Sequence, residues 1–363
     1  MATQRSNRLM NSPTTGWLMA FPATAVIFMF IIVPFLLGFY FSFTNQRLIS
    51  PNPAEWVGTS NFHQLLDVSV LSLQPQRDPA TNEIVKEADG SLTYPSVRSI
   101  TRNNPDFPQY NGMKEWFSWT SGTTREVVVA KDVVFMKAML NTFEFVFIVA
   151  PVQGGLALLL ALMINQKLAG INIFRTIFFM PVVVSIVVVS LLWRFIYSGD
   201  NGLLNGMLSF LSFGTFKPVD WLGNPLTALP AIMVMSIWQA VGFHMVIWLS
   251  GLQTIPVSLY EAADIEGASN WQKFRFVTWP GLRNTAVLVL VVITMQAFTL
   301  FSQVQVMTAG GPLDATQTIV FQALDHGYAK QDISAGSAIS VILFIIVISV
   351  SLLQRYLTRE KTA

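Results

Sequence analysis

Long windows with at most one charged residue alternate with more highly charged stretches along this chain. A helix needs about 20 mainly apolar residues to span a bilayer, so each long window is a candidate span. The windows that meet this length are 17–43, 138–164, 176–196, 226–249, 284–307 and 333–354. The pattern therefore predicts an all-α polytopic membrane protein with six transmembrane helices.

Two of these windows contain a charged residue near one end. Glu144 lies in the second window and Arg194 in the third. Because Arg194 stands beside Trp193 and Tyr197, we interpret it as an anchor at the membrane interface. An ion pair between Arg194 and Glu144 is the less favoured alternative.

Lysine and arginine in the short connections indicate the orientation, because these residues are retained on the cytosolic side. With a cytosolic amino terminus, the short outer loops hold only Lys217 and Lys330. The cytosolic segments then hold Arg5, Arg8, Lys167, Arg175, Lys273, Arg275, Arg283, Arg355, Arg359 and Lys361. Both termini are therefore expected in the cytosol. The first apolar window is too long for a signal peptide, so it is expected to remain as a span.

Residues 44–137 form a long outer segment between the first two windows. It is rich in proline, asparagine and serine, with scattered aromatic residues. Within it, 127–129 and 133–135 suit strands or the start of the helix that follows. A partly disordered loop and a docking surface for a partner protein are both compatible with this composition.

A charged stretch at 258–280 separates the fourth and fifth windows, on the cytosolic side of the expected topology. Ser258 and Glu261 have the spacing of a capping box, which predicts a short helix beginning near Leu259. Gly267 suits the left-handed residue that ends such a helix.

A second helix is expected directly after this glycine. Ser269 and Gln272 repeat the spacing of the capping box, and Pro280 marks the end of the helix. The stretch is therefore predicted to be a helical hairpin at one face of the membrane.

Composition narrows the possible functions. Charged residues make up 12% of the 363 residues and apolar residues 52%, which fits a membrane protein better than a soluble one. A net charge of +2 implies no nucleic-acid partner. There is no cysteine, the histidines His63, His244 and His326 are far apart, and no Gly-Lys-Ser or Gly-Lys-Thr phosphate loop occurs. We expect no metal, cofactor or catalytic residue in this chain.

Polar side chains inside the fourth and fifth windows are the candidate ligand contacts, since such residues are costly in a membrane. Gln296, Thr299 and Gln303 are spaced to share one face of a helix, and Gln239 lies four residues before Phe243. Amides and a ring suit an uncharged ligand with many hydroxyl groups. The alternative is that the amides form hydrogen bonds between helices. His244 is interpreted as an interior histidine.

The 258–280 stretch resembles a known motif. Its residues follow the EAA loop of permease subunits in binding-protein-dependent ABC importers, although that family usually has isoleucine and leucine at the places of Val277 and Trp279. The matching residues are Glu261, Ala262, Ala263, Gly267 and Pro280. Further stretches are similar to carbohydrate permeases, including 180–183, 192–195, 251–256 and 309–312. The resemblance covers about 138–357, and the larger permease of the maltose transporter also has an enlarged outer domain.

This resemblance implies a domain plan and a set of partners. A cytosolic start and first span at 1–43 and an extracytoplasmic insertion at 44–137 precede a permease core at 138–357, with the coupling hairpin at 258–280 and a cytosolic tail at 358–363. The implied partners are a second permease, two ATP-binding cassette subunits that carry ATP and Mg²⁺, and an extracytoplasmic solute-binding protein. The implied location is a bacterial-type cytoplasmic membrane.

The resemblance also implies roles for particular residues. Coupling to the ATPases would involve Glu261, Ala262, Ala263 and Gly267. The helices that hold the sugar in the maltose permease correspond to those carrying Gln239, Phe243, Gln296 and Leu300. The implied function is ATP-driven import of a neutral carbohydrate or sugar-like solute, with no enzymatic activity in this chain.

Two other classes of function are less favoured. An ion-coupled secondary transporter would bind its ion through acids near the middle of the membrane, and Glu144, the one acid within a predicted span, stands near an end. A membrane-embedded enzyme would need paired carboxylates or a histidine cluster at a membrane face, and the sequence shows neither.

Overall fold

The computed structural model describes residues 13–78, 81–87, 90–166 and 170–358. The chain divides into two compact units, one of residues 1–63 with 323–342 and the other of residues 64–322 with 343–363. Arg5, Arg8, Lys167, Arg359 and Lys361, which supported the predicted orientation, lie outside the described residues, as does most of the predicted tail.

The first unit contains the first predicted span. Helix α2 (Pro13–Ile27), the π-helical turn η1 (Phe28–Ile32) and α3 (Val33–Phe41) follow one another, and Gly16–Phe41 is long and apolar enough to cross a membrane. After α3 the chain is tied to the start of α17 (Ile333–Thr358), because Ser334 Oγ donates to the Gln46 carbonyl at 3.1 Å and lies 3.2 Å from Thr44 Oγ1.

The second unit begins with a small lobe that contains a β-sheet. Strands β1 (Val68–Leu73), β2 (Lys114–Ser121) and β3 (Thr124–Ala130) are antiparallel in the order β1-β3-β2. The lobe also holds α5 (Val97–Thr101) and η2 (Pro108–Tyr110), and α4 (Ser60–Leu66) precedes it. The prediction of an all-α protein is therefore wrong for the insertion.

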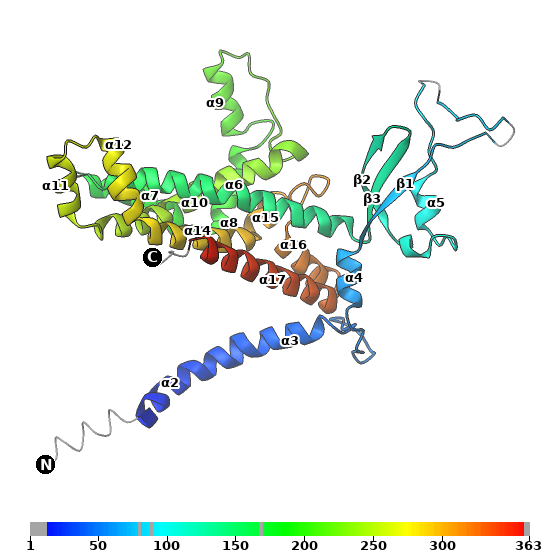
Figure 1. Cartoon of the computed structure of the whole chain (residues 1–363), viewed down its shortest axis with the longest axis horizontal. Helices are drawn as coiled ribbons and strands as arrows, with labels where there is room; N and C mark the ends of the chain where they lie inside the picture. The colour runs from blue at the N-terminus through cyan, green and yellow to red at the C-terminus, as the bar shows by residue number, and fades with distance from the viewer. Residues whose placement is uncertain (1–12, 79–80, 88–89, 167–169, 359–363) are drawn as a thin grey trace. The chain divides into compact units, whose positions relative to one another are not determined.

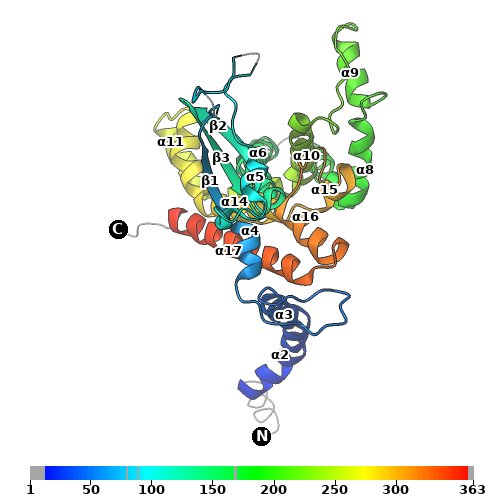
Figure 2. The same cartoon turned by 90° about the vertical axis from the view of Figure 1, so that its right-hand side faces the viewer.

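The lobe has its own apolar core. The buried residues are Leu71, Leu73, Met113, Val127 and Val129, with Val97 and Ile100 of α5 packed against them. The side chains at 127 and 129 are completely buried because β3 is the central strand and its alternate residues face this core. Figure 2 shows α5 beside the three strands. Residues 127–129 are thus a strand, one of the two alternatives that the sequence left open.

Residues 133–135 instead begin α6 (Val133–Ile164). Asp132 caps this helix, because its Oδ1 accepts a hydrogen bond from the Phe135 backbone N–H at 2.9 Å. The cap starts the helix five residues before the apolar window begins.

The rest of the second unit is helical. It contains α6, α7 (Ile171–Val183), α8 (Ile186–Ile196), α9 (Leu203–Leu211), α10 (Pro225–Gln253), α14 (Arg283–Phe298) and α15 (Ser302–Met307). The hairpin contains α11 (Val257–Ile265), α12 (Asn270–Lys273), η3 (Phe274–Thr278) and α13 (Trp279–Gly281). Helix α16 (Ile319–Leu324) begins in this unit, η4 (Asp325–Ala329) and the first part of α17 belong to the first unit, and the rest of α17 returns to the second.

Four helices in the described part of the chain are long and apolar enough to be uninterrupted spans: Gly16–Phe41, Val133–Ile164, Pro225–Gln253 and Ile333–Leu357. The predicted third span is not one helix, since α7 and α8 meet at an angle of 96°. Val184 and Ser185 have extended backbone there, three to four residues after Pro181, which has no backbone N–H to donate.

The predicted fifth span is also interrupted. Residues 270–281 and 283–298 meet at 68°, and the helix stops at Phe298 before resuming at Ser302. The count reaches six spans only if each bent pair is taken as one.

Helices α6 and α10 run side by side through the second unit (Figure 1). The indole N–H of Trp248 donates to the Gly154 carbonyl at 3.1 Å, and α14 packs on α6 next to this contact. At 1.5 Å per residue α6 is about 48 Å long, enough to cross a bilayer. The sheet lies at one end of α6 and the hairpin at the other (Figure 1).

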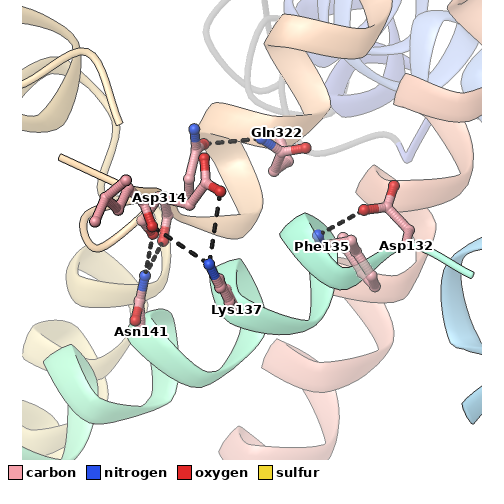
Figure 3. A network of polar contacts seen from close by, with 8 residues as sticks. Asp132, Phe135, Lys137, Asn141, Asp314 and Gln322 are labelled. Carbon is pink, nitrogen blue, oxygen red and sulfur yellow. Dashed lines mark hydrogen bonds and ion pairs between the residues drawn. The ribbon is translucent and has the colours of Figure 1, made fainter. Parts of the chain in front are cut away.

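A loop at 308–318 is fixed to the amino-terminal end of α6 (Figure 3). Asn141 Nδ2 donates to the carbonyls of Asp314 and Gln317 at 3.1 and 3.0 Å, while Lys137 Nζ lies 3.7 Å from the Asp314 carboxylate. Gln322 Nε2 donates to Gln317 Oε1 at 2.8 Å. These contacts hold the segment that follows α15, and α15 carries part of the cavity described next.

Candidate functional site: a cavity and a helical hairpin

A cavity of about 390 Å³ lies inside the helices of the second unit. It is bounded by α6, by the α7–α8 bend, by α10 and by the α14–α15 break. Its lining residues are Phe145, Val149, Gln153, Val182, Ile186, Ser236, Gln239, Ala240, Phe243, Ile293, Gln296, Ala297, Thr299, Leu300 and Gln303. The space is of the size that holds a small organic molecule.

All six residues proposed from the sequence as ligand contacts line this one cavity. They are Gln239, Phe243, Gln296, Thr299, Leu300 and Gln303. The structure thus brings the candidates together, and their contact with a solute stays a prediction.

The fifth predicted span reaches the cavity in a different way from the one expected. The sequence argument placed Gln296, Thr299 and Gln303 on one face of a continuous helix, but the helix is broken at 299–301. The Leu300 carbonyl, left without a helical partner, accepts a hydrogen bond from Thr318 Oγ1 at 2.9 Å. The break turns Thr299 and Leu300 toward the cavity without leaving this carbonyl unpaired.

The cavity lining has no charged side chain. Its polar residues are amides and hydroxyls, and Ser236 Oγ is buried without a partner in the part of the chain that the structure describes. A buried hydroxyl that lines a cavity and has no partner marks a place where a ligand atom would be favoured.

The sequence argument missed two polar lining residues, Gln153 and Ser236. Ser236 is three residues before Gln239, so it shares a helical face with a residue that was singled out. Gln153 is an amide in the middle of the second apolar window, and the cost of a polar group there was the signal that should have identified it.

The structure bears on two other sequence interpretations, those of His244 and Arg194. His244 is fully buried and does not line the cavity, as expected for an interior histidine. Arg194 donates to the Val306 carbonyl at 3.4 Å and forms no ion pair with Glu144 among the described residues. Trp238 packs against Trp193, with ring centroids 5.5 Å apart.

The hairpin begins earlier than the sequence predicted. Pro256 is the N-cap of α11, with φ −58° and ψ 130°, so the first helical residue is Val257 and not Leu259. Ser258 is therefore already inside the first turn, and no side chain caps this helix. The expected capping box of Ser258 and Glu261 is wrong because the preceding proline fixes the start of the helix two residues upstream.

The glycine turn and the second box are confirmed. Gly267 has φ +73°, its N–H donates to the Asp264 carbonyl, and the Ala268 N–H donates to the Ala263 carbonyl. This pair of bonds is a Schellman motif. Ser269 and Gln272 exchange both hydrogen bonds of a capping box.

The two arms of the hairpin are held together by an ion pair between Asp264 and Lys273. The second arm continues through η3 and α13 to Gly281, so Pro280 lies in its last turn, close to the predicted end.

The proposed coupling residues lie on an accessible surface. Glu261, Ala262 and Gly267 are exposed, and Glu261 has no hydrogen-bond or ion-pair partner among the described residues. Ile265 is 89% exposed on the same helix. These residues are thus open to a partner, and their role in coupling stays a prediction.

Comparison with known proteins gives clear relatives. The chain is 36% identical to the trehalose/maltose transport system permease protein MalF of Thermococcus litoralis over 208 residues, which are 57% of this chain and 69% of the relative. It is 31% identical to the lactose transport system permease protein LacF of Rhizobium radiobacter over 274 residues, 74% of this chain and 89% of the relative.

A solved structure shares the fold. A chain of a bacterial ABC transporter involved in the import of the acidic polysaccharide alginate matches with a TM-score of 0.69 at 19% identity, covering 99% of this chain and 100% of that one. At this identity the match shows the fold alone.

The family itself is shown by a model of the binding-protein-dependent transport system inner membrane component, which matches residues 153–362. That range is more than half of the chain, and it includes the hairpin and most of the cavity lining. The resemblance of the 258–280 stretch to the EAA loop agrees with it. The chain therefore belongs to the family of inner-membrane components of binding-protein-dependent transport systems.

Proposed function

We propose that this chain is a permease subunit of an ATP-driven importer and that its cavity passes a neutral carbohydrate or sugar-like solute. The observation that carries the proposal is the lining, which combines amides, hydroxyls and the Phe243 ring without a charged side chain. Amides serve hydroxyl groups as both donor and acceptor, and a ring face packs on the apolar face of a sugar. The relatives named for trehalose, maltose and lactose transport support the same class.

The energy for transport comes from two partner subunits that bind ATP and Mg²⁺. A second permease completes the pathway, and an extracytoplasmic protein delivers the solute. A structure similar to this chain in fold was solved with a pentasaccharide-bound periplasmic protein, which supports this mode of delivery. The complex lies in a bacterial-type cytoplasmic membrane with both termini of this chain in the cytosol.

The hairpin transmits the motion of the ATPases to the helices around the cavity. Glu261 offers a carboxylate to an arginine or a backbone donor of the ATPase, and Ala262 and Ala263 allow close approach of a second helix. The carboxyl end of the hairpin leads through Gly281 directly into α14, which carries Gln296 at the cavity. A push on the hairpin therefore moves one wall of the cavity.

An ion-coupled transporter remains the alternative, and membership of this family does not favour it. The absence of a carboxylate from the cavity lining also argues against a proton or sodium site there.

The test is transport by the assembled complex in proteoliposomes. Tagged chain is purified with its partner subunits, ATP is enclosed or omitted, and uptake is measured for maltose, trehalose, lactose and a glucuronic-acid disaccharide in the presence of the binding protein. We expect uptake of a neutral disaccharide that requires both ATP and the binding protein. Uptake driven by a proton or sodium gradient without ATP would refute the proposal, and uptake of the charged sugar alone would refute its neutral-solute part.

A further inference from the structure

Gln153 and His244 meet at the wall of the cavity, one from α6 and the other from α10. Gln153 lines the cavity, while His244 lies behind it with no exposed surface. His244 Nδ1 is 2.9 Å from the amide end of Gln153 and also 2.9 Å from the carbonyl oxygen of Ala240. These two distances determine where the hydrogen atoms must be.

A backbone carbonyl only accepts hydrogen bonds, so the contact with Ala240 requires the proton on Nδ1. A protonated Nδ1 has no lone pair with which to accept from an amide N–H. The Gln153 atom that faces the ring must therefore be Oε1, which shares the Nδ1 proton with Ala240. The contact at 2.9 Å is with the atom assigned as Nε2, but a half-turn of the amide exchanges Nε2 and Oε1 within the same space.

This assignment places the Gln153 NH₂ group on the side of the cavity. The outward end of the amide has no hydrogen-bond partner among the described residues, and it is not among the buried polar atoms that lack one. Two N–H donors in a fixed direction thus face the open space. His244 Nε2 then has a lone pair and no hydrogen-bond partner in the described part of the chain, so the Gln153 N–H groups do not donate to it.

A second, independent observation points to a ligand at the same place. Ser236 Oγ, on the face of α10 that carries Gln239, is buried without a partner and belongs to the same lining. A serine within a helix commonly points to solvent or bonds the carbonyl four residues earlier, and Ser236 does neither. Both unpartnered groups are on helices that contact each other directly.

We propose that Gln153, oriented by His244, is a specificity-determining donor that recognises one hydroxyl or ether oxygen of the solute. His244 is a positioning residue, since it does not reach the cavity and acts by keeping the amide oxygen turned away from it. The inference rests on the proposed function, because it takes the cavity to be the passage for a sugar. An amide held in one orientation discriminates strongly between a solute with an acceptor oxygen at that position and a solute without it. An amide that rotates freely discriminates less between the two solutes.

The test uses the neutral disaccharide that the assembly transports and its monodeoxy analogues, each lacking one hydroxyl. We expect the wild-type assembly to transport one analogue about tenfold more slowly than the parent sugar, the effect of one lost hydrogen bond. In Gln153→Glu, which keeps the bond to Nδ1 but has no N–H donor, that ratio should fall to about one. Because the same binding protein serves every variant, its own preference cancels in the comparison.

Two substitutions at His244 separate positioning from packing. His244→Phe keeps a ring of similar size without the donor and should reduce the ratio of parent to analogue transport. His244→Asn places an amide N–H where Nδ1 stood and should restore this ratio.

Gln74→Glu, the same chemical change on the exposed surface of the lobe, should keep the wild-type ratio. A wild-type ratio in Gln153→Glu would overturn the donor role, and a wild-type ratio in His244→Phe would overturn the positioning role. Failure of the wild-type assembly to transport any neutral disaccharide would instead refute the proposed function.

Discussion

Substituting leucine for Gly267 is expected to abolish solute-stimulated ATP hydrolysis by the assembled importer while the chain still inserts into the membrane. Gly267 has φ +73° in the turn between α11 and α12. A branched side chain at such a φ costs about 1–2 kcal/mol, so the turn would open and change the angle between the two arms. Stimulated ATPase activity in proteoliposomes should fall to the unstimulated level, at least about tenfold, because the hairpin no longer fits its partner.

The matched control is Gly267→Asn. Asparagine tolerates the left-handed conformation, and a Cβ at this position would meet no atom within 4 Å, so this variant should keep most of the stimulation.

Glu261→Lys reverses the charge of a carboxylate without intramolecular partners in the described chain, so it should lose stimulation with the fold unchanged. Full stimulation in both Gly267→Leu and Glu261→Lys would show that the hairpin does not couple the two proteins.

The local signals in the hairpin were strong enough to predict most of it. Gly267 and the box of Ser269 with Gln272 were identified correctly because both depend only on residues a few positions apart. The prediction of the first capping box was wrong for an equally local reason. The fixed φ of Pro256 starts the helix at Val257, so Ser258 lies inside the first turn and cannot be its N-cap. Capping patterns should therefore be weighed against any proline just upstream.

Apolar windows predicted where the helical segments lie along the chain better than whether each segment is one continuous helix. The windows at 138–164 and 226–249 correspond to the unbroken α6 and α10. The windows at 176–196 and 284–307 are also long and mainly apolar, yet each contains a break. Hydropathy measures the cost of contact with lipid. It carries no information on a backbone group whose hydrogen bond is made to another part of the protein, such as the Leu300 carbonyl bonded by the Thr318 side chain.

The sequence analysis selected residues of the cavity lining by their chemistry and predicted nothing of its geometry. Gln239, Gln296 and Gln303 were selected because polar groups are costly in a membrane, and the cavity explains why they are there. Gln153 could have been selected by the same rule, since it is an amide in the middle of the window at 138–164, whereas its contact with His244, 91 residues away in sequence, could not have been predicted. The sheet in the lobe was missed for a similar reason, since β1 pairs with a strand more than 50 residues later and short exposed strands carry little periodic signal.

Substituting alanine for Gly242 is expected to have the largest effect on stability. A Cβ at this position would stand 2.0 Å from the Phe178 carbonyl oxygen and 2.7 Å from its carbon, so α7 and α10 touch there through their backbones. Neither atom belongs to a flexible side chain, and the two helices would have to separate at a cost of about 3 kcal/mol. Because Gly242 adjoins Phe243 and α7 carries Val182, the separation would also deform the cavity.

The measurement is the apparent melting temperature of the purified assembly in detergent, together with solute uptake at a temperature where the variant is folded. Gly242→Ala should lower the melting temperature by at least about 5 °C and reduce uptake. Gly155→Ala is the control, since a Cβ there meets nothing within 4 Å and alanine favours the helix. An unchanged melting temperature in Gly242→Ala would mean that α7 and α10 do not approach each other this closely, and the cavity boundary formed by α7 would then have to be redrawn.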